Sequence, residues 1–308
     1  MDRTDVDGLS VKQLRECIAA HGMSFADCLE KAELRERAWE AMQHAAAGGS
    51  GVGARSDKHE CESAIDEVAA RLGIDPLLLP RRTVCVGPHR LTVNQNWLAD
   101  TTPDNTGSAC WPGSLLLAHY MISSAAETVR RAAATGMWLE LGCGAAALPG
   151  TCLLRSCPEA RGRLTFADRT QDLLDQARSN LERNCPEGIG PSPVVQLEWG
   201  AELPEGVSRG GCSLVICAEL LYEVSAVAPL LSTLDALLTQ DGAAVFGHRE
   251  RNGAHAAMVE LAAVHGFEWV ELSWRPWDDD SYELTQAEAA GWGSPLSILR
   301  LGLLRRIR

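Results

Sequence analysis

Between residues 137 and 304, short apolar runs alternate with longer stretches of helical periodicity, and this alternation limits the possible folds most strongly. The apolar runs are nearly unbroken, which is typical of strands buried on both faces of a parallel sheet. We expect strands at 137–141, 164–167, 194–198, 214–218, 243–246, 267–272 and 298–304, and helices at 148–157, 170–184, 224–239 and 254–265. The pattern predicts an α/β fold with a mostly parallel sheet and helices on both faces.

A stretch rich in Gly, Ala and Ser at residues 44–58 divides the chain, because this composition is typical of a flexible linker. Before it, apolar residues at helical spacing predict a small helical module over residues 1–43. After it, we expect a second domain over residues 59–308, with its core over residues 82–308.

Charge and cysteine usage exclude several classes of function. The formal net charge of −13 makes nucleic-acid binding through the overall field of the protein unfavourable. No run of about 18 apolar residues occurs, and the N-terminus is polar, so we expect neither a membrane span nor a secretory signal. The eleven cysteines lack CxxC pairs and zinc spacing, which predicts free, mostly buried thiols and no metal site. Without a signal or a clear basic nuclear cluster, we expect the protein in the cytoplasm, the nucleus or both.

The segment MWLELGCGAAALPG, residues 137–150, carries the strongest chemical signal. A glycine backbone at Gly142 and Gly144 can turn sharply and lie against a ligand, and the following helix N-terminus attracts anionic groups. With Ala147 the pattern fits the GxGxxG/A loop of NAD or FAD sites, although another nucleoside cofactor fits equally. Asp168, at the next acidic strand end, would accept hydrogen bonds from ribose hydroxyls in either case. The structural alternatives are a tight turn for the glycines and a helix N-cap for Asp168.

Residues after the third and fourth predicted strands help to separate these cofactors. Trp199 ends the third strand segment, while Glu219 and Tyr222 follow the fourth and would share one side of a helical turn. Such a negative, aromatic-edged slot suits a cationic or polar nitrogen substrate and suits hydride transfer poorly. A solvated cap and a rim aromatic are the structural alternative. His248 and Arg249 follow the next strand, and either border the site or have a structural role.

Together these motifs resemble class I, seven-strand S-adenosylmethionine-dependent methyltransferases, and more narrowly methyltransferase family 16, which consists largely of protein-lysine methyltransferases. The upstream segment TGSACWPG, residues 106–113, is similar to the family's G-x-x-x-W segment that leads into a helix. The resemblance covers about residues 82–308 and implies a Rossmann-like, seven-stranded sheet. It also implies S-adenosylmethionine as cofactor and a lysine ε-amine of a partner protein as methyl acceptor. Another protein side chain, a small amine, and a non-catalytic cofactor-binding protein stay open as alternatives.

The resemblance also implies roles for single residues. Glu219 and Tyr222 match the family's (D/E)xx(Y/F) motif, which lines the channel of the acceptor lysine, and are the expected catalytic residues. Asp168 would hold the ribose and Trp199 would pack on adenine. Ala146 stands where the family usually has glycine, so its methyl group is expected to narrow the pocket. The full set of expected cofactor-binding residues is Trp111, Glu140, Gly142, Cys143, Gly144, Asp168, Trp199 and Ala218.

The N-terminal module resembles a degenerate SAP-like helix–extension–helix unit, from VKQLRECIAAHGMSFADC through EKAELRERA. SAP units often bind DNA. Residues 1–44, however, carry six Lys and Arg against nine Asp and Glu, and this balance disfavours contacts with phosphate. We therefore expect the module to contact a protein or to act as a spacer.

Overall fold

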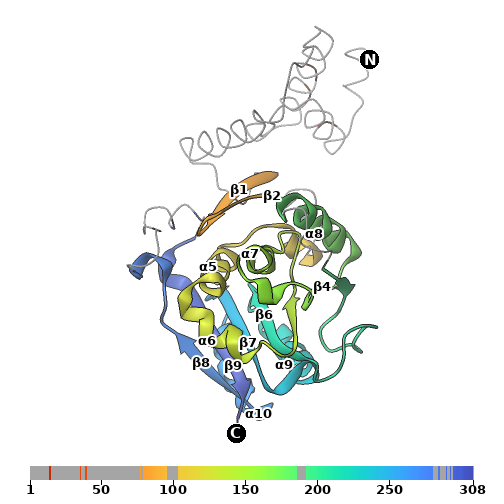
Figure 1. The fold of residues 1–308 in the computed structure, drawn as a ribbon, viewed down its shortest axis with the longest axis vertical. Coiled ribbons are helices and arrows are strands. Elements are labelled where there is room, and N and C mark those ends of the chain that lie inside the picture. Colours follow the sequence, from red (N-terminus) through yellow and green to blue (C-terminus); the bar gives the residue numbers. More distant parts are fainter. Residues whose placement is uncertain are drawn as a thin grey trace. The chain divides into compact units, whose positions relative to one another are not determined.

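The computed structural model describes residues 79–95, 103–185, 192–279 and 294–307, together with Leu14, Arg35, Trp39, Leu77, Leu284, Ala289 and Trp292. The chain divides into two compact units, Met1–Arg71 and Leu72–Arg308. Apart from three of these single residues, the predicted N-terminal module and linker lie outside the described part. All the strands and helices named below belong to the second unit (Figure 1).

The strands and helices of the second unit follow one another largely as the periodicity predicts. The strands are β1 (Arg81–Val86), β2 (His89–Asn94), β3 (Met137–Leu141), β4 (Leu164–Asp168), β5 (Val194–Gln196), β6 (Cys212–Ala218), β7 (Leu238–Arg249), β8 (Phe267–Leu272) and β9 (Leu299–Arg306). The α-helices are α5 (Pro112–Ile122), α6 (Glu127–Ala132), α7 (Leu148–Ser156), α8 (Gln171–Asn184), α9 (Val227–Leu237) and α10 (Ala254–Val264). The expected helix over 224–239 divides into a 3-10 turn, Val224–Ala226, and α9.

Within the described residues, seven strands form one sheet in the order β5-β4-β3-β6-β7-β9-β8. Neighbours from β5 to β7 pair in parallel, whereas β9 runs antiparallel to both β7 and β8. This arrangement confirms the predicted Rossmann-like, mostly parallel α/β sheet. The chain moves outward from β3 through β4 to β5, and then returns to β6 and moves the other way. Ligands of such sheets bind at the carboxyl ends of the strands where the order reverses, here between β3 and β6.

Side chains alternate across the sheet and divide the core into two layers. Trp138 and Ile216 pack with apolar residues of α5, α7 and α8 on one face. Leu139, Leu141 and Val215 pack with residues of α9 and α10 on the other face. The apolar strands are therefore unbroken because helices cover both faces, as Figure 1 shows.

A two-stranded hairpin of β1 and β2, which the periodicity did not predict, packs against α8. Two asparagines of α8 pair with the backbone of β2 as a neighbouring strand would. Asn184 bonds both the N–H and the carbonyl oxygen of Thr92, and Asn180 bonds those of Asn94, each at 2.9 Å. The amide of Asn180 also donates to the carbonyl oxygen of Ala145 at 2.7 Å. Asn180 therefore connects the hairpin to the turn after β3.

Candidate active site

A cavity of about 290 Å³ opens at the carboxyl ends of the central strands. Its wall combines the turn after β3, the end of β4 and the segments after β5 and β6, where the sheet topology places a ligand site. Nine of the ten predicted site residues line it: Trp111, Gly142, Cys143, Gly144, Asp168, Trp199, Ala218, Glu219 and Tyr222. Glu140 does not.

The turn after β3 brings bare backbone to the cavity wall. Gly142 and Gly144 have φ values of +62° and +57°, which residues with side chains rarely adopt. The N–H of Gly144 donates to Oδ2 of Asp168 at 2.8 Å. The N–H of Ala145 donates to the carbonyl oxygen of Gly107, also at 2.8 Å. The turn is therefore held from two sides, by the end of β4 and by the segment before α5.

Asp168 is the last residue of β4 and is only 7% exposed. Its Oδ1 accepts the N–H of Arg169 at 2.7 Å, and Thr170 occupies the N-cap position of α8, so Asp168 is not that helix's cap. Burial raises the pKa of Asp168, while backbone N–H groups, that of Gly144 first, act in the opposite direction. A carboxylate has about four lone-pair sites, so Asp168 can accept further hydrogen bonds from hydroxyl groups in the cavity.

Ala146 and two aromatic rings shape the rest of the wall. Ala146 lines the cavity, which is open beside it. The rings of Trp199 and Tyr222 lie 6.2 Å apart at an angle of 45°. Burial is the main cause that raises the pKa of Tyr222, which keeps its hydroxyl protonated and able to donate.

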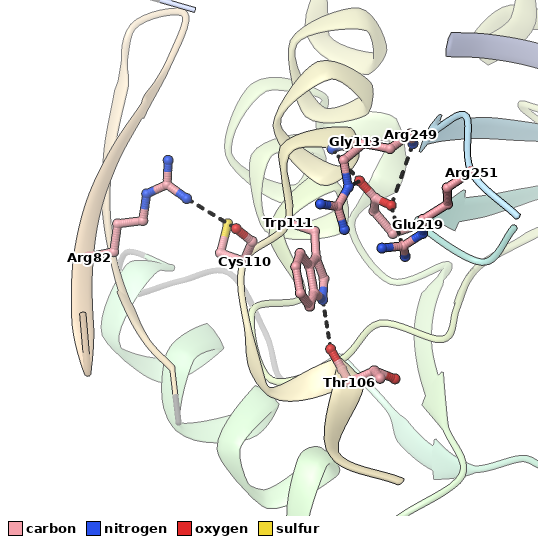
Figure 2. Close-up of polar contacts among 8 residues, drawn as sticks. All are labelled: Arg82, Thr106, Cys110, Trp111, Gly113, Glu219, Arg249 and Arg251. Atoms are coloured by element: carbon pink, nitrogen blue, oxygen red, sulfur yellow. Dashed lines mark hydrogen bonds and ion pairs between the residues drawn. The ribbon is translucent and has the colours of Figure 1, made fainter. Parts of the chain in front are cut away.

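Glu219 lines the cavity and is buried within a network of hydrogen-bond donors. Its Oε1 accepts the N–H of Gly113 at 2.8 Å and Nε–H of Arg249 at 3.1 Å, and its Oε2 lies 3.4 Å from Nη2 of Arg251. The two guanidinium groups lie over the ring of Trp111, 4.5 Å and 5.7 Å from its centre. Figure 2 shows this cluster, in which one carboxylate connects the first turn of α5 to two arginines.

The predicted helical turn over residues 219–222 is wrong. Glu219 has a φ of +57°, outside the right-handed helical region, and the segment has no helical assignment. The donors of Gly113 and Arg249 hold the carboxylate toward α5 in this backbone conformation. Glu219 and Tyr222 nevertheless both line the cavity.

Sequence reasoning did not select Arg251, which lines the cavity. The available signal was the run HRER directly after an apolar strand, at the same sheet edge as Glu219. Of its neighbours, Arg249 belongs to the Glu219 cluster. His248 instead lies with Nε2 3.0 Å from Nδ1 of His255.

Glu140 lies inside β3 and is fully buried. Its Oε2 accepts the N–H of Gly150 in α7 at 2.6 Å, and its Oε1 has no hydrogen-bond partner among the described residues. Burial raises the pKa of Glu140 to about 8, against the opposing effect of the Gly150 N–H. The carboxyl group is therefore mostly protonated at neutral pH, and its bond to the N–H of Gly150 connects β3 to α7.

Replacing Glu140 by Gln should remove a pH dependence of stability. In the unfolded chain this group ionises near its ordinary pKa of 4.5, but in the folded protein it ionises near 8. The wild-type protein therefore loses stability as the pH rises from the lower value to the higher. Relative to E140Q, its free energy of unfolding should fall by about 1.4 kcal/mol per pH unit in this window. Urea unfolding of both proteins measures the effect, and a constant difference across the window would contradict the raised pKa.

The described residues hold no arrangement typical of a metal centre, a membrane span or a disulfide. No group of three or more His, Cys, Asp or Glu side chains in that part of the chain is arranged to hold a metal ion. None of the described helices is long and apolar enough to cross a membrane. The cysteines of the described ranges are free thiols and most are buried, as the sequence predicted for them.

Known proteins resemble this chain in sequence. A family profile described as lysine methyltransferase matches residues 90–263. Protein N-lysine methyltransferase METTL21A of Mus musculus is 27% identical over 198 residues, which cover 63% of this chain and 84% of that protein. Residues 1–44 match a profile described as an E3 ubiquitin-protein ligase rififylin-like domain, so the predicted SAP-like character is not confirmed.

Solved methyltransferase structures are also similar to this chain. The methyltransferase domain of bacterial CtHen1 has a TM-score of 0.44 at 15% identity and covers 62% of this chain and all of that domain. The ribosomal protein L11 methylase of Lactobacillus delbrueckii subsp. bulgaricus has a TM-score of 0.43 at 14% identity and covers 75% of this chain and all of that protein.

Proposed function

Because the chain belongs to the lysine methyltransferase family, we propose that it transfers a methyl group from S-adenosylmethionine to the lysine ε-amine of a partner protein. The observation that carries this proposal is the open cavity, which unites the glycine turn, Asp168 and the segment from Glu219 to Tyr222. The similarity to a protein N-lysine methyltransferase favours lysine as the acceptor.

The residues of the cavity fit S-adenosylmethionine, the cofactor of this family. Asp168 offers a buried carboxylate suited to ribose hydroxyls, and Trp199 offers a flat apolar surface suited to adenine. Gly142 and Gly144 leave backbone without side chains beside them. Small-molecule sites start near about 300 Å³, so a cavity of about 290 Å³ lies at the small end of this range. When bound, S-adenosylmethionine supplies a methyl group made electrophilic by its sulfonium sulfur.

The residues near Glu219 would prepare the acceptor. A free lysine has a pKa of about 10.4, and it must lose a proton before it can accept a methyl group. Burial beside the guanidinium groups of Arg249 and Arg251 would lower that pKa. Glu219 would attract the incoming ammonium group, and the hydroxyl of Tyr222 would orient the nitrogen. Their task is alignment within about 3–3.5 Å of the transferred carbon rather than strong base catalysis.

Transfer of radiolabelled methyl groups into a cell extract tests the proposal, followed by mass spectrometry of the labelled band. We expect label on a lysine of a discrete protein. Label in the metabolite fraction instead would indicate a small amine as acceptor. Cofactor binding without any label transfer would favour the second candidate, a non-catalytic cofactor-binding protein. The specific observation behind that candidate is the methyl group of Ala146 in the cavity wall, where the family usually has glycine.

Replacing Asn180 by Ala should weaken cofactor binding from outside the cavity. The change leaves the carbonyl oxygen of Ala145 and the backbone of Asn94 without a buried partner, which costs about 1–3 kcal/mol of stability. It also releases the turn after β3, so affinity for S-adenosylhomocysteine in calorimetry should fall. Asn184→Ala is the matched control, because Asn184 bonds Thr92 but not Ala145. Equal affinities of the two variants would show that the bond between Asn180 and Ala145 does not support the turn.

A further inference from the structure

The charges around Glu219 do not balance. Two guanidinium groups, of Arg249 and Arg251, share the single carboxylate of Glu219. After burial, the charges of Glu219 and Arg249 have the largest effects on the pKa of Arg251. Glu223, which also lines the cavity, forms no ion pair with either arginine among the described residues, and its carboxylate accepts a hydrogen bond from the hydroxyl of Ser225 at 2.7 Å. Within the cluster of Glu219, Arg249 and Arg251, two positive charges therefore pair with one negative charge.

Arg251 is the arginine that a ligand can reach. Its side chain is 30% exposed and lines the cavity, whereas that of Arg249 is 12% exposed. Nε of Arg251 and Nη2 of Arg249 have no hydrogen-bond partners among the described residues. Burial is the main cause that lowers the pKa of Arg251, and Glu219 acts in the opposite direction. A second anion beside Arg251 would pair with one of the two positive charges that now share the carboxylate of Glu219.

The sheet order places this charge at the acceptor end of the cavity. Arg251 follows β7, next to β6 and Glu219, while Asp168 ends β4. Two strands, β3 and β6, lie between β4 and β7. Arg251 therefore pairs with Glu219, the residue expected at the acceptor, and follows a strand that is not adjacent to β4, so an anion bound at Arg251 would lie beside the acceptor.

We propose that Arg251, positioned by Glu219 and by the ring of Trp111, binds a carboxylate side chain of the target protein next to the methylated lysine. This inference rests on the proposed function. As the target docks, its ammonium group pairs with Glu219 and its carboxylate pairs with Arg251, so two ion pairs replace the shared one. A planar guanidinium suits this exchange, because it can bond a carboxylate through two parallel N–H groups.

A peptide assay with the full chain tests the proposal. Each short capped peptide carries one lysine and one Glu, and the position of the Glu relative to the lysine differs from peptide to peptide. A matched peptide carries Gln at the same position. We expect the Glu peptide to be methylated about tenfold faster at one position close to the lysine, chiefly through KM. R251Q should reduce this ratio to near one, and R251K should restore part of it. R305Q removes an equal charge from β9, where the exposed Arg305 pairs with Glu268 of β8, and this variant should keep the preference.

A phosphoserine peptide distinguishes the two sources of a flanking anion. Glu peptides methylated as fast as phosphoserine peptides, or faster, support a carboxylate, whereas a preference for phosphoserine alone would overturn that assignment. Equal rates for Glu and Gln peptides at every position, or a Glu preference that persists in R251Q, would also overturn the proposal.

A binding measurement separates this proposal from the proposed function. If no peptide is methylated, the Glu and Gln peptides are labelled with a fluorophore and titrated against the protein loaded with S-adenosylhomocysteine. Tighter binding of a Glu peptide that R251Q abolishes would support the anion site even where lysine methylation fails. Equal binding of Glu and Gln peptides would overturn it.

Discussion

Glu219→Ala is expected to lower the rate of methyl transfer about 1,000-fold while affinity for S-adenosylhomocysteine stays close to that of the wild type. The change frees the N–H of Gly113 and leaves Arg249 and Arg251 without their shared carboxylate. Removal of one partner from a buried ion pair costs about 3–5 kcal/mol. If the transition state for methyl transfer loses this stabilisation, the rate falls about 1,000-fold. Two uncompensated cations would also repel the ammonium group of the acceptor.

Because Glu219→Ala can also destabilise the start of α5, Glu219→Gln tests the charge of Glu219 more specifically. Glutamine keeps an oxygen that can accept the N–H of Gly113, so the fold should persist while the negative charge is lost. Glu250→Gln is the control, since Glu250 pairs with Arg300 at 2.6 Å and is half exposed. Calorimetry and single-turnover transfer on all three variants separate binding from chemistry. Wild-type turnover by the Gln variant would remove the charge of Glu219 from the mechanism.

Gly144→Ala is expected to raise the dissociation constant of S-adenosylhomocysteine about 100-fold. A Cβ at this position would lie 2.5 Å from the carbonyl oxygen of Gly107, which is backbone and cannot rotate away. The left-handed backbone, with φ of +57°, adds strain of about 1–2 kcal/mol for a residue with a side chain. The turn would have to leave Gly107 and weaken its bond to Asp168.

Gly206→Ala provides the matched control for this effect. Gly206 has φ of +86°, but a Cβ there would meet nothing within 4 Å. This variant should therefore lose a similar small amount of stability and keep its affinity for the ligand. If Gly144→Ala binds S-adenosylhomocysteine as tightly as Gly206→Ala, the position of the turn after β3 does not control affinity for the ligand.

The parts of the fold that sequence predicts well are those fixed by local burial. The range 137–141 was predicted with the bounds that β3 has. Helices cover both faces of that strand, so its apolar side chains are needed on both faces and form an unbroken run in the sequence. The glycine turn follows equally from local conformation, since Gly142 and Gly144 adopt positive φ. Residues placed at strand ends by this pattern meet at one sheet edge, which is why nine of the ten predicted site residues line the cavity.

The parts that sequence did not predict depend on contacts between distant segments. Glu140 was assigned to the cofactor, but it stands one residue before the end of its strand and so points to a face of the sheet, under α7. The link between Glu219 and Arg251 depends on the pairing of β6 with β7, which local periodicity does not encode. The hairpin was not predicted, although the residues on either side of Gly87 include several that favour strands. Two such runs separated by a short turn are typical of a hairpin.

The hairpin has a practical consequence for protein production. The family likeness begins at residue 90, which is inside β2. Truncation at that point would remove β1, including Arg82, whose guanidinium donates to the carbonyl oxygen of Cys110 beside Trp111. Expression of a shortened catalytic unit should therefore start before Arg81, and a version cut at residue 90 should be more sensitive to limited proteolysis.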